Sequence, residues 1–158
     1  MAGSDVQLQW QVENLLARYV HALDDDRLED WPAFFSARGR YRITTAENHA
    51  RGLPLCIVQA DSPAMMRDRV AALRHANIYE AQAYRHVVSS TLITGVEGGV
   101  VAAVSNFQVV RIMHDGAMSL FASGRYLDRI STAGELCFED KLVLLDSRRV
   151  DTLLAIPL

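Results

Sequence analysis

Hydrophobic residues recur at three- and four-residue steps along the first part of the chain. Between Val6 and Leu23 they form one apolar face, which predicts an amphipathic helix. After the acidic run 24–26, Asp26 and Glu29 have the spacing of a capping box, which predicts a second, short helix ending at Gly39. Its inward-facing residues are expected to be Leu28, Trp31, Phe34 and Phe35.

A strand and a third helix are predicted next. Residues Tyr41 to Thr45 favour a strand, and the segment 48–52 favours a loop. Ser62 followed by Pro63 is typical of a helix start, with Ser as the N-cap and Pro at the first helical position. This helix is expected to extend to about Ala76, with Met66, Val70 and Leu73 facing inward.

The pattern changes from Tyr84 onward. Long β-rich runs are divided by glycine turns at 97–99, 115–116 and 133–134, and Asp115-Gly116 is a strong hairpin signal. Helices followed by a meander of antiparallel strands indicate an α+β fold, with the helices on one face of a curved sheet. We expect one domain over residues 1–158, a length that a single core can support.

Composition and charge narrow the function classes. The net charge of −3 argues against a broad nucleic-acid surface. Cys56 and Cys137 are too few for a disulfide framework and are expected to be free thiols. The start of the chain lacks the features of an export signal, and no apolar run approaches the ~20 residues of a membrane span. These features predict a cytoplasmic protein without a membrane or nucleic-acid partner.

The sequence offers little support for a metal-binding or nucleotide-binding site. The five histidines stand at 21, 49, 75, 86 and 114, too far apart to pair on one helical turn, and neither cysteine has a nearby histidine. The chain also lacks a glycine-rich phosphate loop and a nucleophile-elbow motif. We therefore expect no metal-binding and no cofactor-binding residues.

General acid–base chemistry is the remaining option. Its candidates are His21, Asp24, Tyr41, His86 and Asp128. A structural interpretation is stronger for each: His21 and Asp24 as solvated residues at a helix end, and His86 in a buried hydrogen bond or ion pair. Asp128 is expected to form a cross-strand salt bridge beside Arg125 and Arg129. The prediction is therefore that the chain has no catalytic residues.

The order of several short segments carries a resemblance to a known family. The segments are 19–31 with Phe34-Phe35, Asp68-Arg69-Val70, Leu73-Arg74, Tyr84-Arg85-His86, Phe121 to Asp128, and Asp151-Thr152-Leu153. Together they resemble the small (β) subunits of Rieske-type aromatic-ring-hydroxylating dioxygenases along nearly the whole chain. Further stretches, such as Asn48-His49-Ala50, Ala76 to Glu80 and the Leu-Ala-Ile-Pro-Leu end, look like the small subunit of terephthalate dioxygenase. The stretch from Asp24 to Trp31 is equally similar to the Rieske-type salicylate hydroxylase, and both resemblances are to subunits acting on aromatic carboxylates.

The resemblance implies an NTF2-like (cystatin-like) cone, with three N-terminal helices packed on a curved antiparallel sheet. It also implies a non-catalytic structural role beside a large α subunit in an α3β3 hexamer. In that family the α subunit carries a Rieske [2Fe-2S] cluster and a mononuclear non-heme iron, supplied with electrons from NAD(P)H through a reductase or ferredoxin.

Two questions stay open at this point. The apolar end of the chain, Leu153 to Leu158, must be covered by its own core or by another chain, and its removal is expected to weaken assembly with α. The same cone fold also hosts stand-alone isomerases and dehydratases. That alternative needs an open pocket with an isolated carboxylate, whereas a cone filled by Trp31, Phe34, Phe107 and Phe121 removes it.

Overall fold

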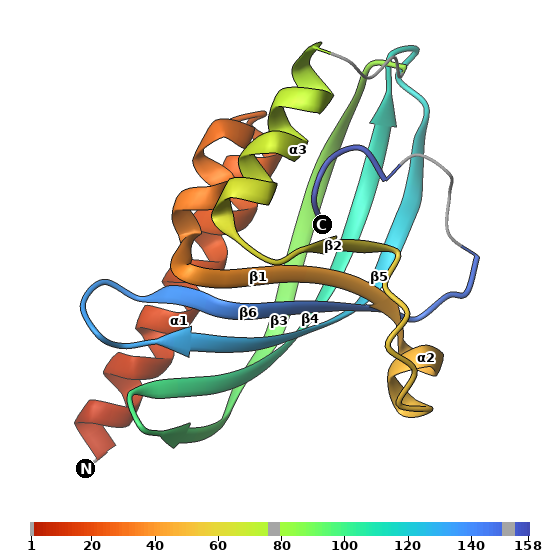
Figure 1. The fold of residues 1–158 in the computed structure, drawn as a ribbon. Helices are drawn as coiled ribbons and strands as arrows, with labels where there is room; N and C mark the ends of the chain where they lie inside the picture. The colour runs from red at the N-terminus through yellow and green to blue at the C-terminus, as the bar shows by residue number, and fades with distance from the viewer. Residues whose placement is uncertain (1, 76–79, 150–153) are drawn as a thin grey trace.

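The computed structural model describes residues 2–75, 80–149 and 154–158 (Figure 1). Residues 76–79, which include the predicted end of the third helix at Ala76, and the whole quoted segment Asp151-Thr152-Leu153 lie outside this range. The elements in chain order are α1 Ala2–Asp24, the 3₁₀ helix η1 Leu28–Phe34, β1 Phe35–Thr45, α2 Ala46–Ala50, β2 Val58–Ala60, α3 Pro63–His75, β3 Gln82–Glu97, β4 Val100–Met113, β5 Met118–Ser131 and β6 Cys137–Leu145.

The strands form one curved sheet in the order β2-β1-β6-β5-β4-β3, with α1 and α3 on the same side of it (Figure 1). The predicted α+β architecture is confirmed. Every neighbouring pair is antiparallel except β1 and β6, which run parallel. Parallel neighbours need a long crossover connection. Here the chain from α2 through β5 supplies it, so this pairing could not be read from local patterns.

The helices use the apolar faces that the sequence predicts. In α1 the buried side chains include Val12, Leu15, Leu16, Tyr19 and Leu23. At the start of α3, the Ser62 hydroxyl oxygen accepts a hydrogen bond from the Met65 N–H (3.2 Å), as expected of an N-cap. Met66, Val70 and Leu73 are buried from the same helix.

The prediction of a capping box at Asp26 and Glu29 is wrong. Asp26 has a φ of 57°, in the left-handed region, and η1 begins without a side-chain cap. Both carboxylates instead accept hydrogen bonds from Arg74 at the end of α3, at 2.8–3.1 Å. The acidic pair therefore joins η1 to α3.

Three boundaries also differ from the prediction. The second helix ends at Phe34 instead of Gly39, and β1 begins at Phe35, six residues earlier than expected. Gly39 lies within β1, where a register shift separates Phe35 from Arg40. The segment after β1 contains a short helix, α2, that was expected to be loop. The N-cap of α2 is Thr45, whose hydroxyl oxygen accepts a hydrogen bond from the Asn48 N–H.

The predicted glycine turns connect the strands. Gly98 and Gly99 form the whole β3–β4 connection and both have positive φ, 58° and 76°. These angles suit the tight turn that matches strand twist, and glycine adopts them without steric cost. Gly116, at φ 88°, lies in the β4–β5 turn, where the Asp115 carboxylate accepts from the Ala117 N–H.

Candidate functional site

The interior of the cone, between the sheet and the helices, gathers most of the acid–base candidates. Tyr41, His86 and Asp128 are buried, and the side chain of Asp24 is only 3% exposed. Asp24 follows Val20 by four residues, so it continues the inward face of α1 instead of facing solvent as expected. His21 is exposed, so its side chain lies outside this interior cluster.

Asp24 and His86 form a buried dyad. The Nδ1 of His86 lies 2.6 Å from one carboxylate oxygen of Asp24, and the His86 backbone N–H donates to the same carboxylate at 3.0–3.2 Å. His86 was expected in a buried hydrogen bond or ion pair; the buried hydrogen bond is confirmed, and its partner is Asp24. Among the described residues the other ring nitrogen, Nε2, is buried without a hydrogen-bond partner. The dyad holds the end of α1 against β3.

Asp128 is paired, but with a residue that the sequence did not single out. The Nζ of Lys141, directly opposite on β6, lies 3.2 and 3.3 Å from the two carboxylate oxygens, and both side chains are fully buried. The predicted cross-strand salt bridge of Asp128 is therefore confirmed. Arg125 and Arg129 take no part in it, because alternation along β5 turns those two side chains to the other face of the sheet.

Three aromatic rings surround the Lys141 ammonium group. Its Nζ lies 3.5 Å from the ring centroid of Tyr126 and 4.6 Å from those of Tyr19 and Phe138. A cation is attracted to the negative face of each ring. Burial lowers the pKa of Lys141 and raises that of Asp128, while the attraction between them opposes both shifts. The space between the three rings is therefore occupied by the Lys141 ammonium group and is closed to a ligand.

The end of the chain occupies the remaining interior space. Leu158 is fully buried, and its main-chain oxygen accepts hydrogen bonds from the hydroxyls of Tyr19 (3.0 Å) and Tyr41 (3.1 Å). The Leu158 N–H donates to the Tyr41 hydroxyl at 2.9 Å, and Arg69 donates to the Leu154 carbonyl oxygen. Figure 1 shows the end of the chain lying inside the curve of the sheet. The described part of the apolar tail, 154–158, is thus covered by its own core.

The rest of the cone is filled by aromatic side chains. Trp31 packs edge-on against Tyr41 with ring centroids 5.1 Å apart, and Phe107 stacks on Tyr126 at 4.4 Å. Phe34 and Phe121 are partly buried and pack against the same core. Beside Phe121 and Leu158 a cavity of about 30 Å³ is left, comparable to the volume of one water molecule. Both interior carboxylates, Asp24 and Asp128, are paired, unlike the isolated carboxylate that a stand-alone isomerase requires.

The Tyr41 hydroxyl offers a direct test of this packing. Replacing Tyr41 with Phe leaves the buried N–H and oxygen of Leu158 without that partner, so we expect a loss of about 1–2 kcal/mol in the free energy of unfolding. Tyr126→Phe is the matched control, because the Tyr126 hydroxyl is buried without a hydrogen-bond partner among the described residues. Urea unfolding checks both variants. Equal losses would contradict the role given to the Tyr41 hydroxyl.

A larger hollow lies outside the cone. A cleft of about 500 Å³ separates α1 and η1 from the start of β6, and its lining includes Arg18, Phe34, Glu135 and Cys137. Arg18 and Glu135 form an ion pair across it at 3.1 Å, and both side chains are largely exposed. Burial raises the pKa of the Cys137 thiol, so this cysteine is not an activated nucleophile.

Within residues 2–75, 80–149 and 154–158, no group of three or more His, Cys, Asp or Glu side chains is close enough together to hold a metal ion. None of the helices described there is long and apolar enough to cross a membrane.

The interior contains two residues that the sequence interpretation missed, Lys141 and Tyr126, whereas Tyr19 was expected on the apolar face of the first helix. Tyr126 was within reach of periodicity, since it lies on the inward face of β5. Lys141 was hidden by a bulge. Arg129 pairs with Asp140 but Ile130 pairs with Phe138, so Glu139 is an extra residue that turns Lys141 inward.

Comparisons with known proteins agree on one family. Residues 4–135 match the model of the SnoaL-like domain. The chain is 43% identical to the terephthalate 1,2-dioxygenase terminal oxygenase component subunit beta 1 of a Comamonas species, over 94% of this chain and 97% of the relative. It is 39% identical to the anthranilate 1,2-dioxygenase small subunit of Burkholderia cepacia, over 98% and 96% of the two chains.

A solved structure gives the same result. The beta subunit assigned to an aromatic-ring-hydroxylating dioxygenase of Novosphingobium aromaticivorans superposes with a TM-score of 0.90 at 35% identity, covering 98% of this chain and 99% of the other. The chain therefore belongs to the SnoaL-like domain family and, within it, to the small (β) subunits of aromatic-ring-hydroxylating dioxygenases.

Proposed function

We propose that this chain is the structural β subunit of an oxygenase that hydroxylates or dihydroxylates an aromatic carboxylate. The observation that carries the proposal is the similarity to the small subunits of terephthalate and anthranilate dioxygenases, at 43% and 39% identity over nearly the full length of the chain. Both relatives are named for ring substrates that bear a carboxylate. Terephthalate, anthranilate and salicylate are accordingly the first compounds to try.

The proposal includes a division of labour between this chain and a large partner subunit. Its interior carboxylates are paired and its cone is filled, so we assign it no catalytic, metal-binding or cofactor-binding residues. The oxygen chemistry belongs to a large α subunit carrying a Rieske [2Fe-2S] cluster and a mononuclear non-heme iron, with electrons from NAD(P)H delivered to α by a reductase or ferredoxin. The assembly is an α3β3 hexamer in the cytoplasm, in which this single-domain chain stabilises α.

Co-expression of the tagged chain with its large subunit tests this function. We expect a brown, iron-bearing complex with the mass of an α3β3 hexamer, which consumes oxygen in the presence of NAD(P)H, reductase and an aromatic carboxylate. A colourless oligomer of the tagged chain alone would contradict the proposal.

The same complex tests the absence of catalysis in the β subunit. Asp24→Asn and His86→Gln change the only histidine–carboxylate pair of the described interior. The turnover per iron is expected to match that of the unmodified complex once assembly and iron content are equal. A large loss of turnover at full iron content would favour acid–base chemistry in the cone instead.

A further inference from the structure

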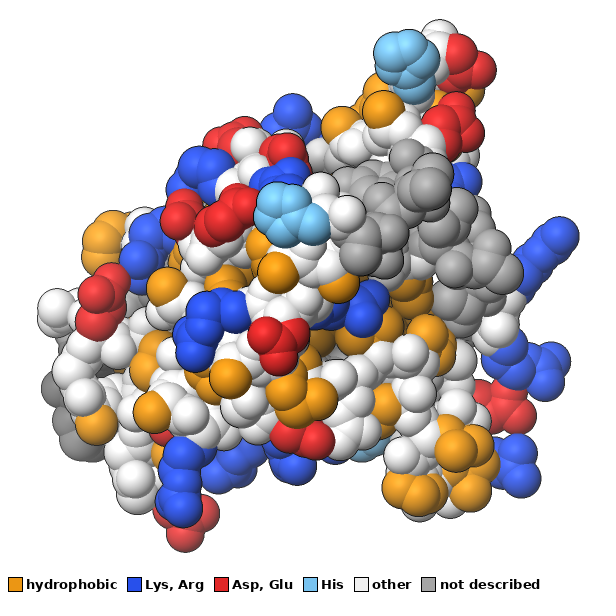
Figure 2. Space-filling model, turned by 45° about the horizontal axis from the view of Figure 1, so that its top comes forward, with side chains coloured by type: hydrophobic (Ala, Val, Ile, Leu, Met, Phe, Trp, Pro, Cys, Tyr) orange, Lys and Arg blue, Asp and Glu red, His pale blue; other side chains and the backbone are white. Residues whose placement is uncertain are grey.

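The segment Leu53–Ile57, which we call the apolar loop, exposes hydrophobic side chains in succession. It reads Leu-Pro-Leu-Cys-Ile, and all of its residues except Cys56 are exposed; Leu55 is 62% exposed. Isolated exposed hydrophobic residues are ordinary on a protein surface. A run of three or more exposed hydrophobic residues is a fault in a designed protein unless it serves a function, so in a natural chain it marks a functional surface. Figure 2 shows hydrophobic side chains gathered at the corner where α2 lies, with basic side chains next to them.

The backbone of the apolar loop is fixed at both ends. The Leu53 N–H donates to the Asn48 carbonyl oxygen in α2 (2.9 Å), and the Ile57 N–H donates to the Ile43 carbonyl oxygen in β1 (2.7 Å). In the middle, the Thr44 hydroxyl donates to the Leu55 carbonyl oxygen at 2.7 Å. A loop that is already ordered loses little conformational entropy when a partner binds it. It is therefore suited to anchor an interface.

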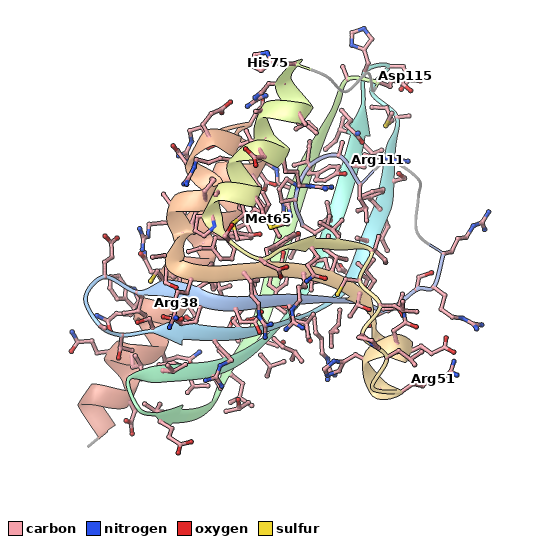
Figure 3. All side chains as sticks on the ribbon, viewed as in Figure 1. Arg38, Arg51, Met65, His75, Arg111 and Asp115 are labelled. Atoms are coloured by element: carbon pink, nitrogen blue, oxygen red, sulfur yellow. The ribbon has the colours of Figure 1, made fainter. Side chains whose placement is uncertain are left out.

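Basic residues border the apolar loop. Arg51, labelled at this corner in Figure 3, lies 3.8 Å from Glu47, and Arg148 lies 3.2 Å from the other oxygen of the same carboxylate. Two guanidinium groups share one carboxylate, so the three side chains retain one positive charge. Both arginine side chains are mostly exposed, at 65% and 80%. A matching surface would offer an apolar hollow with acidic groups at its rim.

The positive charge beside the apolar loop favours one kind of binding partner over another. A two-fold contact between copies of this chain would place the apolar loop against itself and the same basic rim against its copy. Like charges facing each other across an interface oppose association. A different chain with carboxylates around an apolar hollow meets no such repulsion.

We propose that the apolar loop, with Arg51 and Arg148 at its rim, is an anchoring contact for the large oxygenase subunit. The inference rests on the proposed function and adds to it the surface used and the chemistry of the partner. Leu55 inserts into an apolar hollow on the large subunit, and the two arginines face carboxylates there. Stable obligate interfaces bury about 2,000 Å² or more, so the loop supplies a central contact within a larger surface.

The test compares two matched substitutions in the co-expressed complex. Leu55→Asp places a charge in the proposed contact, and Val96→Asp places one at the end of β3 on a side chain of almost equal exposure, 60%. We expect Leu55→Asp to reduce the amount of large subunit retained per tagged chain at least about tenfold, and Val96→Asp to leave it unchanged. Leu55→Ser repeats the test without a new charge, and thermal melts of the isolated variants confirm that each is folded.

The rim is tested separately. The double variant Arg51→Glu, Arg148→Glu is expected to weaken retention further as the salt concentration falls, because the new carboxylates repel acidic groups on the partner. Retention of the Leu55→Asp variant at the level of the unmodified chain overturns the inference and leaves the proposed function intact.

Two other outcomes also count against the inference. If Leu55→Asp and Val96→Asp lose the same amount of retained large subunit, the apolar loop has no special role in the contact. A smaller oligomer of isolated Leu55→Asp with normal retention of the large subunit would assign the loop to contacts between copies of this chain. Failure of the unmodified chain to retain any large subunit contradicts the proposed function itself.

Discussion

Replacing Lys141 with Met is expected to lower the free energy of unfolding by about 3–5 kcal/mol. Met has a similar length and fits among the same rings, so the loss comes from charge instead of volume. The substitution removes the ammonium group that lies 3.2 and 3.3 Å from the Asp128 carboxylate oxygens and leaves that carboxylate buried without its partner. Urea unfolding at pH 7 measures the effect.

The pH dependence of the variant identifies the cause. Burial raises the pKa of Asp128, and in Lys141→Met the opposing attraction of the ammonium group is gone. A carboxyl group with a raised pKa in the folded state stabilises the protein below its unfolded pKa, and that stability is lost as the pH rises through the folded pKa. The difference in the free energy of unfolding between the variant and the unmodified chain should therefore be largest at neutral pH and should shrink as the solution is acidified.

A double variant is the control. Lys141→Met combined with Asp128→Leu removes both charges, and replacement of a buried ion pair by apolar side chains is often close to neutral. The double variant should accordingly be more stable than Lys141→Met alone. A single variant within about 1 kcal/mol of the unmodified chain would show that the ion pair adds little to the fold.

Local patterns predicted most of the fold. The three- and four-residue spacing found α1 and α3, because one face of each helix packs on the sheet, and Ser62 caps α3 as its position indicates. The turns at Gly98-Gly99 and Asp115-Gly116 were also readable, because few other residues adopt their backbone conformations. The fold class follows from these elements and their order.

The errors arose where long-range contacts override local chemistry. The spacing of Asp26 and Glu29 suits a capping box, but the guanidinium of Arg74, 45 to 48 positions away in sequence, binds both carboxylates. The parallel pairing of β1 with β6 likewise depends on residues about a hundred positions apart. Neither contact leaves a signal in the neighbouring sequence.

The interior site was predicted only in part for the same reason. His86 was expected in a buried pair, and the structure supplies Asp24 as the partner from the end of α1. The cross-strand partner of Asp128 depends on the bulge at Glu139, since strict alternation from Phe138 would turn Lys141 away from the core. A single inserted residue in a strand reverses the facing of every residue after it.

Gly124→Ala is expected to destabilise the protein by about 3 kcal/mol or more, at the upper end of the cost of overpacking a core. Gly124 faces inward from β5, and a Cβ built there would overlap the Leu144 main-chain oxygen and lie 3.1 Å from the Phe107 ring. The carbonyl belongs to the backbone of the neighbouring strand, so it can move only if the β5–β6 pairing opens. The ring is held in its stack on Tyr126.

Thermal unfolding gives the measurement, because a loss of about 3 kcal/mol in a chain of this size lowers the Tm by about 6–12 °C. Gly95→Ala is the control: it adds the same methyl group to β3, where no atom lies within 4 Å of the new Cβ. Reduced chain entropy in the unfolded state alone makes that change neutral or stabilising by up to about 1 kcal/mol. Similar Tm values for the two variants would mean that β5 and β6 separate easily at Gly124, and the close packing of the cone interior described above would not hold there.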